Sequence, residues 1–167
     1  MPRSKKILIF SLAYYPRHVS GAEAAVKEIT DRISDIEFHM VTLHFDPTDS
    51  KEEKIGNVFV YRVGDNGSYF SKTFFPLTAA LKARSLERMH NFKAVWAMMT
   101  YMLLPTVILR MLGVRLPHIL TLQDGDPYEK VFTRFRILPF VPLLNYGFRT
   151  ASVIQAISTY LATWPGK

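Results

Sequence analysis

Short apolar runs alternate with longer amphipathic stretches along most of this chain. Several runs are almost continuously apolar, which is typical of strands in a parallel sheet covered on both faces. We expect strands at residues 6–11, 37–43, 58–63, 94–99, 118–122 and 153–157. We expect helices at residues 21–34, 78–89, 105–112 and 128–150, the last in one or two pieces, and a polar loop at residues 46–56. This order predicts a doubly wound, mostly parallel sheet in a three-layer α/β/α, Rossmann-like fold with right-handed crossovers.

The clearest local signal lies between the first strand and the first helix. Ser20 and Glu23 have the spacing of a capping box, which marks a helix start. Gly21 follows as the first helical residue, and its missing side chain leaves the amides there open to an anion. A capping box also occurs at helices that bind nothing. In a doubly wound sheet, however, ligands gather at the carboxyl ends of the strands, where this turn is expected.

Length and composition favour one domain spanning residues 1–167. The chain has 167 residues, of which 49% are hydrophobic, and this is enough for one core of ordinary size. It contains no cysteine, which excludes disulfides and thiolate chemistry. The five histidines show no ligand-type spacing along the sequence, so we expect no metal site.

The charge balance favours anionic partners, because Lys and Arg number 21 against 14 Asp and Glu, a net charge of +7. No basic block or RNA-binding motif accompanies this charge, so nucleic acid is not an expected partner. The apolar run at residues 7–10 is too short for a signal peptide. The uncharged segment 94–109 is too short for a membrane span and is interrupted by Pro105. We therefore expect a cytoplasmic protein with no spanning segment.

Segments along essentially the whole chain resemble the N-terminal domain of the family 4 type of GT-B glycosyltransferases, retaining enzymes with two Rossmann-like halves. They are the strand at residues 6–10 with Tyr15-Pro16 and Gly21-Ala22-Glu23 after it, the strand at 36–42, the strand at 117–122 with Gln123-Asp124 after it, and the strand at 153–157 with Ser158 after it. The chain departs from the family pattern twice. Ser20 replaces the first glycine of a usual pair, and Gln123 replaces a histidine. The resemblance implies one half of a GT-B fold.

The resemblance also implies roles for residues at the carboxyl edge of the sheet. It places Asp124 near the reacting sugar as the candidate catalytic residue, although Asp124-Gly125-Asp126-Pro127 is also a strong turn sequence. Gln123 can exchange hydrogen bonds with a sugar hydroxyl but cannot act as an acid. The other candidate substrate-binding residues are Ser20, Gly21, Tyr15, Arg17, His18 and Ser158. The alternative for the loop aromatics is that they only cover the sheet.

The implied donor is a nucleotide sugar as co-substrate, with no further cofactor, and the implied acceptor is a glycan or a lipid-linked saccharide. In this family a second domain supplies most of the nucleotide-sugar site, including paired glutamates, and nothing in these residues resembles it. We expect a fragment of a longer enzyme, because the sequence ends inside a helix; the alternative is a single-domain relative that works with a partner subunit. We expect residues 1–167 alone to fold, to transfer no sugar and to self-associate through the uncovered rim.

Aromatic and basic residues around the second helix indicate a membrane interface, which suits an enzyme with a lipid-linked acceptor. The candidate membrane-binding residues are Phe70, Phe74, Phe75, Lys82, Arg84 and Arg88. A second cluster expected on the same surface comprises Phe132, Arg134, Phe135, Arg136 and Phe140. The alternative is a core-packed helix with a solvated basic face.

Together these features favour the acceptor-binding half of a retaining, sugar-nucleotide-dependent glycosyltransferase of cell-envelope glycan or glycolipid assembly, peripheral on the inner face of the plasma membrane. The alternative is a non-catalytic basic α/β module that binds an anionic ligand, an anionic membrane surface or a partner subunit. A flavodoxin-like or dinucleotide-binding protein is disfavoured, because no G-x-G-x-x-G follows the first strand.

Overall fold

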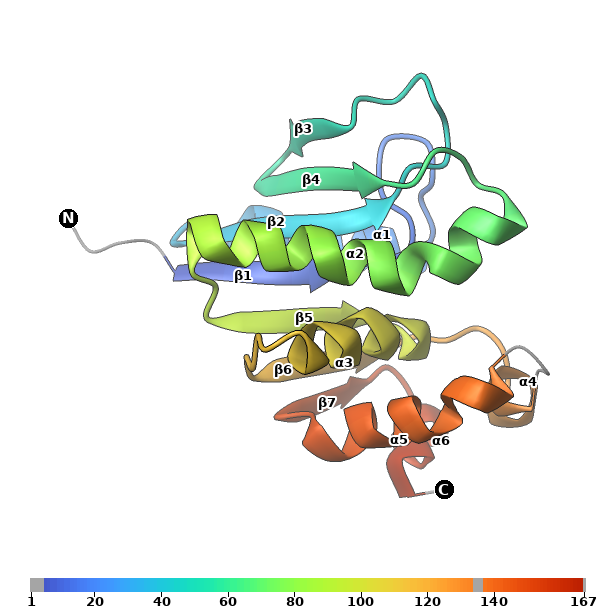
Figure 1. Cartoon of the computed structure of the whole chain (residues 1–167). Coiled ribbons are helices and arrows are strands. Elements are labelled where there is room, and N and C mark those ends of the chain that lie inside the picture. The colour runs from blue at the N-terminus through green and yellow to red at the C-terminus, as the bar shows by residue number, and fades with distance from the viewer. Residues whose placement is uncertain (1–4, 134–136, 167) are drawn as a thin grey trace.

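The structure, a computed structural model, describes residues 5–133 and 137–166. Its centre is a seven-stranded sheet in the order β3-β4-β2-β1-β5-β6-β7 (Figure 1). The strands are β1 (Lys5–Phe10), β2 (Ile36–Leu43), β3 (Glu52–Ile55), β4 (Val58–Val63), β5 (Ala94–Met98), β6 (His118–Leu122) and β7 (Val153–Ala156). Neighbouring strands are parallel except for the antiparallel pair of β3 and β4. The predicted doubly wound α/β fold is confirmed.

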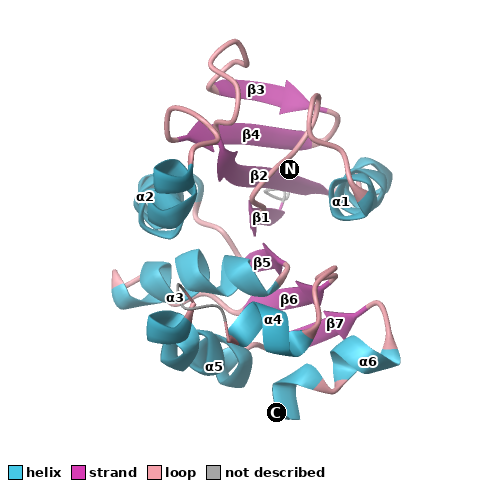
Figure 2. Cartoon of the chain, turned by 90° about the vertical axis from the view of Figure 1, so that its right-hand side faces the viewer, coloured by secondary structure: helices cyan, strands magenta, loops and turns pink. Residues whose placement is uncertain are grey.

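Helices cover both faces of this sheet (Figure 2). They are α1 (Gly21–Arg32), α2 (Tyr69–His90), α3 (Leu103–Met111), α4 (Tyr128–Phe132), α5 (Val141–Thr150) and α6 (Thr159–Ala162). Helices α2, α3 and α5 lie on one face, and α1 and α6 lie on the other. Within the described residues, no helix combines the length and the apolarity needed to cross a bilayer.

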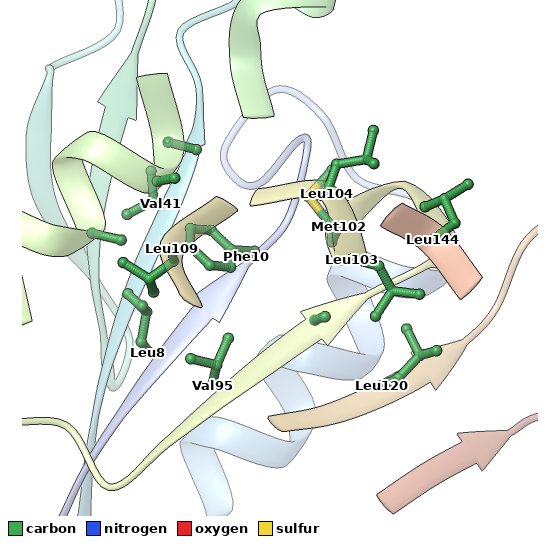
Figure 3. Packing of buried hydrophobic residues seen from close by; sticks show 14 of the residues in the cluster. Leu8, Phe10, Val41, Val95, Met102, Leu103, Leu104, Leu109, Leu120 and Leu144 are labelled. Atoms are coloured by element: carbon green, nitrogen blue, oxygen red, sulfur yellow. The ribbon is translucent and has the colours of Figure 1, made fainter. Parts of the chain in front are cut away.

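The core follows from the alternation of side chains along the strands. Leu8 and Phe10 point toward α3 and its neighbours, where they join Leu109 and Leu144 in the larger buried cluster (Figure 3). Ile9 lies between them in sequence and packs on the opposite face, in a second cluster that includes residues of α1. Because both faces of the central strands are buried, their sequences are apolar at nearly every position.

Two expectations about the elements were wrong. The segment expected as a loop at residues 46–56 contains β3, which forms a hairpin with β4 through Gly56 and Asn57. Gly56 has a φ of 57°, a left-handed conformation that glycine adopts without strain. Helix α2 begins at Tyr69, well before the expected start at residue 78, because Ser68 caps it by accepting a hydrogen bond from the Ser71 amide.

A proline inside α2 explains why the sequence suggested a shorter helix. Pro76 has no amide hydrogen, so the carbonyl of Lys72, one turn earlier, loses its helical donor. The Tyr101 hydroxyl donates to that carbonyl at 2.7 Å, and burial raises the pKa of Tyr101 to about 12, so the hydroxyl keeps its proton at neutral pH. Tyr101, in the short 3-10 turn Thr100–Met102 that precedes α3, thus allows α2 to continue through Pro76.

Replacing the Tyr101 hydroxyl by hydrogen in Tyr101→Phe should leave the Lys72 carbonyl without this donor. We expect a loss of about 1 kcal/mol in the free energy of unfolding, measured by urea titration, since that is the usual net value of one hydrogen bond. Tyr146→Phe is the matched control, because the Tyr146 side chain is 45% exposed. Equal stability of the two variants would contradict the proposed support of α2.

Candidate functional site

The order of the strands reverses at β1, which lies between β2 and β5. In open α/β sheets, ligands bind in the crevice outside the carboxyl ends of the strands at such a switch point. The segment after β1, the turn after β5 and the turn after β6 all begin at this edge, where the strand arrows end in Figure 1. The structure therefore brings the predicted loop, Gly21 and the Gln123-Asp124 turn to one edge of the sheet.

The loop after β1 is fixed from β4 by a buried arginine. The Arg62 guanidinium donates to the Tyr15 carbonyl at 2.8 Å and to the Ser50 carbonyl at 2.6 Å, and it pairs with Glu53 at 2.5 Å. Arg62 itself is only 7% exposed. Arg62 was not among the predicted site residues, because the sequence signals its role only by a single arginine within an apolar strand.

The start of α1 carries the predicted capping box. The Ser20 amide donates to the Glu23 carboxylate at 2.7 Å, and the Ser20 hydroxyl also donates to it, so Ser20 acts on the helix start. Gly21 faces the turn after β6: a Cβ added there would lie 3.2 Å from Nε2 of Gln123. Two residues predicted from separate motifs thus lie in near contact.

Asp124 is held by the turn after β5. The Thr100 amide donates to its carboxylate at 3.1 Å and 3.2 Å, and the Thr100 hydroxyl donates at 3.0 Å. Met99, directly before Thr100, has a φ of 70°, a conformation that costs about 1–3 kcal/mol for a residue with a side chain. Thr100 was not among the predicted site residues; the sequence signal for it is its place just after a buried strand.

Burial raises the pKa of this carboxyl group. Removal from water raises the pKa of Asp124 above its usual range, and the neighbouring charge of Asp126 adds to this. The hydrogen bonds from Thr100 act in the opposite direction and do not outweigh burial. The Thr100 amide and hydroxyl therefore orient the carboxylate, while burial makes its charged form less favourable than it is in water.

The side chains of the predicted loop residues Arg17 and His18 contact other residues of the chain. Arg17 pairs with Asp49 at 2.9 Å and with Asp46 at 3.1 Å. The His18 ring lies 4.4 Å from the ring of Phe45, centroid to centroid. The Arg17 side chain is still 53% exposed, so these contacts shape the rim of the site without closing it.

Ser158 follows β7, the strand next to β6, and is the N-cap of α6. Its hydroxyl accepts a hydrogen bond from the Leu161 amide at 3.2 Å. Asp126, in the turn after β6, pairs with Lys130 of α4 at 2.6 Å. Both residues lie at the carboxyl edge, and both stabilise helices that begin there.

The predicted membrane-binding residues divide between the surface and the core. Phe70 and Phe74 are 70% and 45% exposed, and their rings are 4.4 Å apart. Phe75 is fully buried, so its assignment to a membrane surface was wrong, because it occupies the inner face of α2. Lys82 pairs with Glu52 at 2.6 Å, whereas Arg88 is exposed.

The second aromatic cluster is also divided. Phe132 is 5% exposed and packs in the larger core cluster, which contradicts its placement on a membrane surface. Phe140 is 38% exposed. Arg134, Phe135 and Arg136 lie outside the described residues.

Neither a scan against protein-family models nor a search of curated proteins found a match. Among solved structures, the chain is similar to a sucrose-phosphate synthase from Thermosynechococcus elongatus, with a TM-score of 0.67 and 10% identity over 90% of this chain and 41% of that one. An α,α-trehalose 6-phosphate synthase from Burkholderia multivorans matches with a TM-score of 0.60 and 14% identity over 96% of this chain and 43% of that one. An E. coli structure described as trehalose-6-phosphate bound with UDP-2-fluoro glucose matches with a TM-score of 0.58 and 12% identity, over 96% and 42%.

The chain therefore has the Rossmann-like fold of one half of a GT-B glycosyltransferase. It spans about two fifths of the length of these three structures. At identities of 10–14%, the likeness shows the fold alone.

The raised pKa of Asp124 has a measurable effect on stability. Because the folded-state pKa of Asp124 lies above the ordinary value for an aspartate, the folded protein binds this proton more tightly, and the free energy of unfolding falls as pH rises from about 4 through the folded-state pKa. Asp124→Asn lacks this fall, so its free energy of unfolding relative to the wild type should rise with pH across that range. Urea unfolding at several acid pH values measures the difference.

Asp35→Asn, at an exposed position, is the matched control. Its stability relative to the wild type should change less with pH. A difference between Asp124→Asn and the wild type that stays constant or falls with pH would contradict the effect of burial on Asp124.

Proposed function

We propose that this chain is the acceptor-binding half of a retaining, sugar-nucleotide-dependent glycosyltransferase of the family 4 type, acting in cell-envelope glycan or glycolipid assembly at the cytoplasmic side of the membrane. The observation that carries the proposal is the position of Gly21, where an added Cβ would lie 3.2 Å from Nε2 of Gln123, next in sequence to the Thr100-bound Asp124, at the switch point of the sheet. A second domain or a partner subunit completes the nucleotide-sugar site.

The donor is a nucleotide sugar, which has a diphosphate leaving group. One similar structure is described as bound with UDP-2-fluoro glucose, and this supports the choice of donor class. The first-turn amides of α1 have no intrahelical acceptors and point out of the helix start, where they can stabilise the charge that develops on a diphosphate. Gly21 allows the anion to approach these amides closely.

Asp124 and Gln123 act on the sugar and the acceptor. Asp124 accepts a hydrogen bond from a sugar hydroxyl while Thr100 fixes its orientation, which limits the number of geometries that the bound sugar samples. Gln123 donates and accepts hydrogen bonds without carrying charge. Because Gln123 cannot transfer a proton, the proposed mechanism assigns it no acid or base step.

Binding of a nucleotide sugar tests this proposal directly. Titration of the 15N-labelled chain with UDP, UDP-glucose and inorganic diphosphate should shift the amide resonances of Gly21, Ala22 and Thr100. Gly21→Val should weaken the binding of UDP-glucose by about tenfold or more, because the added side chain fills the space toward Gln123 and blocks the helix-start amides. Gly21→Ala should have a smaller effect.

Gly166→Val is the control, since a Cβ at Gly166 meets open space. Equal binding of UDP-glucose by Gly21→Val and Gly166→Val would remove Gly21 from the site. Unchanged resonances of Gly21, Ala22 and Thr100 with all three ligands would contradict the proposed diphosphate site.

Helix α2 carries the surface that we propose for the membrane. Exposed side chains recur at Phe70, Phe74, Leu77 and Leu81, a spacing of four, three and four residues that places them on one face of the helix. Arg84 and Arg88 continue the same spacing. An apolar stripe that continues into cations matches the combination that gives reversible binding to anionic lipid.

Sedimentation with anionic liposomes measures this attachment. We expect binding that weakens as salt rises, and a loss of about tenfold in Phe70→Ser/Phe74→Ser and in Arg84→Glu/Arg88→Glu. Lys82→Glu should have a smaller effect, because Lys82 is paired with Glu52. Met111→Ser, at a 72% exposed residue of α3, is the control. No binding at low salt, or equal binding by all variants, would contradict the proposed surface.

A further inference from the structure

Polar side chains gather at the amino-terminal edge of the sheet, away from the candidate sugar site. Lys6 lies near the start of β1, Glu37 and His39 lie on β2, and His90 is the last residue of α2. Glu37 and His39 are two residues apart and therefore share a face of the sheet. Because α2 runs back along that face, its last turn reaches the beginning of the strands (Figure 1).

The ligand atoms of three of these residues converge. One carboxylate oxygen of Glu37 and one ring nitrogen each of His39 and His90 lie within 4.8 Å of one another. Nε2 of His39 is 2.6 Å from Oε1 of Glu37, and the two imidazole rings are 4.1 Å apart between centroids. Two ligands of a tetrahedral zinc ion at the usual bond lengths stand about 3.4 Å apart. The three atoms are thus close to the separations that one ion requires.

The cluster already attracts a cation. The Lys6 ammonium is 2.8 Å from Oε1 of Glu37 and 3.4 Å from Nδ1 of His90. It uses the lone pairs that a metal ion would take, so lysine and metal compete for the same atoms. The Lys6 side chain is 28% exposed and unbranched, and it can turn into water.

The surroundings of His39 suit a metal ligand. Its ring lies 5.1 Å from the ring of Phe59 and 5.2 Å from that of Phe92, and only 2% of the side chain is exposed. Nδ1 is 3.1 Å from the Tyr61 hydroxyl, which can accept a hydrogen bond from it in the tautomer that leaves Nε2 without a proton. A metal-binding histidine typically holds its second nitrogen in this way, which fixes the ring and leaves the other lone pair for the ion.

We propose that Glu37, His39 and His90 form a binding site for Zn²⁺ or a similar divalent first-row ion, in competition with Lys6. Two imidazole nitrogens and one carboxylate oxygen are among the donor sets that zinc prefers. The ion joins β2 to the end of α2, and water can complete its coordination, because the Glu37 side chain is 30% exposed. The site acts as a cross-link, and it is independent of sugar transfer.

Removal of the Lys6 ammonium tests the proposal. At a metal site its removal frees the ligand atoms and tightens zinc binding, whereas in a cluster that serves only as an ion pair it creates no zinc binding. After treatment with a chelator, the chain is titrated with Zn²⁺ by calorimetry and with Co²⁺ by visible absorption. We expect one ion per chain and tighter binding in Lys6→Met, by about tenfold or more. Glu37→Gln and His90→Gln should each weaken binding by about tenfold or more, because each removes one of the three ligands. Zinc should raise the melting temperature of the wild type and of Lys6→Met, and EDTA should reverse this.

His18→Gln is the matched control, since His18 is an exposed histidine at the opposite edge of the sheet. It should bind zinc as the wild type does. Thermal melts without metal establish that each variant folds, and Glu37→Gln and His90→Gln test the site separately at partly exposed positions. Failure of both the wild type and Lys6→Met to bind zinc, or equal binding by His90→Gln and His18→Gln, would overturn the proposal.

Discussion

The candidate sugar site depends on the position of β1 between β2 and β5. The chain moves outward from β1 to β2 and β4, then crosses back over the sheet to β5, so the segments that follow β1 and β5 diverge at their carboxyl ends. Ligands of open α/β sheets bind where such a divergence occurs. Gly21 lies at this point on the β1 side, and Thr100 and Asp124 lie on the β5 and β6 side. Every proposed contact with substrate follows from this reversal.

Long-range hydrogen bonds fix the conformation of the irregular segments at the carboxyl edge of the sheet. Arg62 holds the carbonyl of Tyr15 from β4, Thr100 holds the carboxylate of Asp124 from the turn after β5, and Tyr101 holds the carbonyl that Pro76 leaves open in α2. Each of these groups would otherwise lose hydrogen bonds on leaving water. The same bonds that satisfy the backbone thus fix the geometry of the site, and the strained conformation of Met99 is retained because Thr100 is bound on both its amide and its hydroxyl.

The two edges of the sheet offer different chemistry. At the carboxyl edge, helix-start amides and an oriented carboxylate suit a sugar with a diphosphate. At the amino-terminal edge, imidazoles and a carboxylate suit a metal cation. The net charge of the chain does not indicate either site, because Arg17, Lys82 and Lys130 are paired with acidic residues and Lys6 lies within the amino-terminal cluster.

The fold class, most strand positions and the start of α1 could be predicted from the sequence, because these depend on local periodicity and on one capping box. The shared edge of Gly21, Gln123 and Asp124 could be predicted as well, since parallel strands share the direction of their carboxyl ends. The interaction partners of individual residues required the folded structure. It showed that Phe75 is buried, that α2 passes through Pro76 with help from Tyr101, and that Glu37, His39 and His90 meet. These outcomes depend on contacts between residues far apart in the chain, and no local pattern encodes which surfaces of the elements face each other.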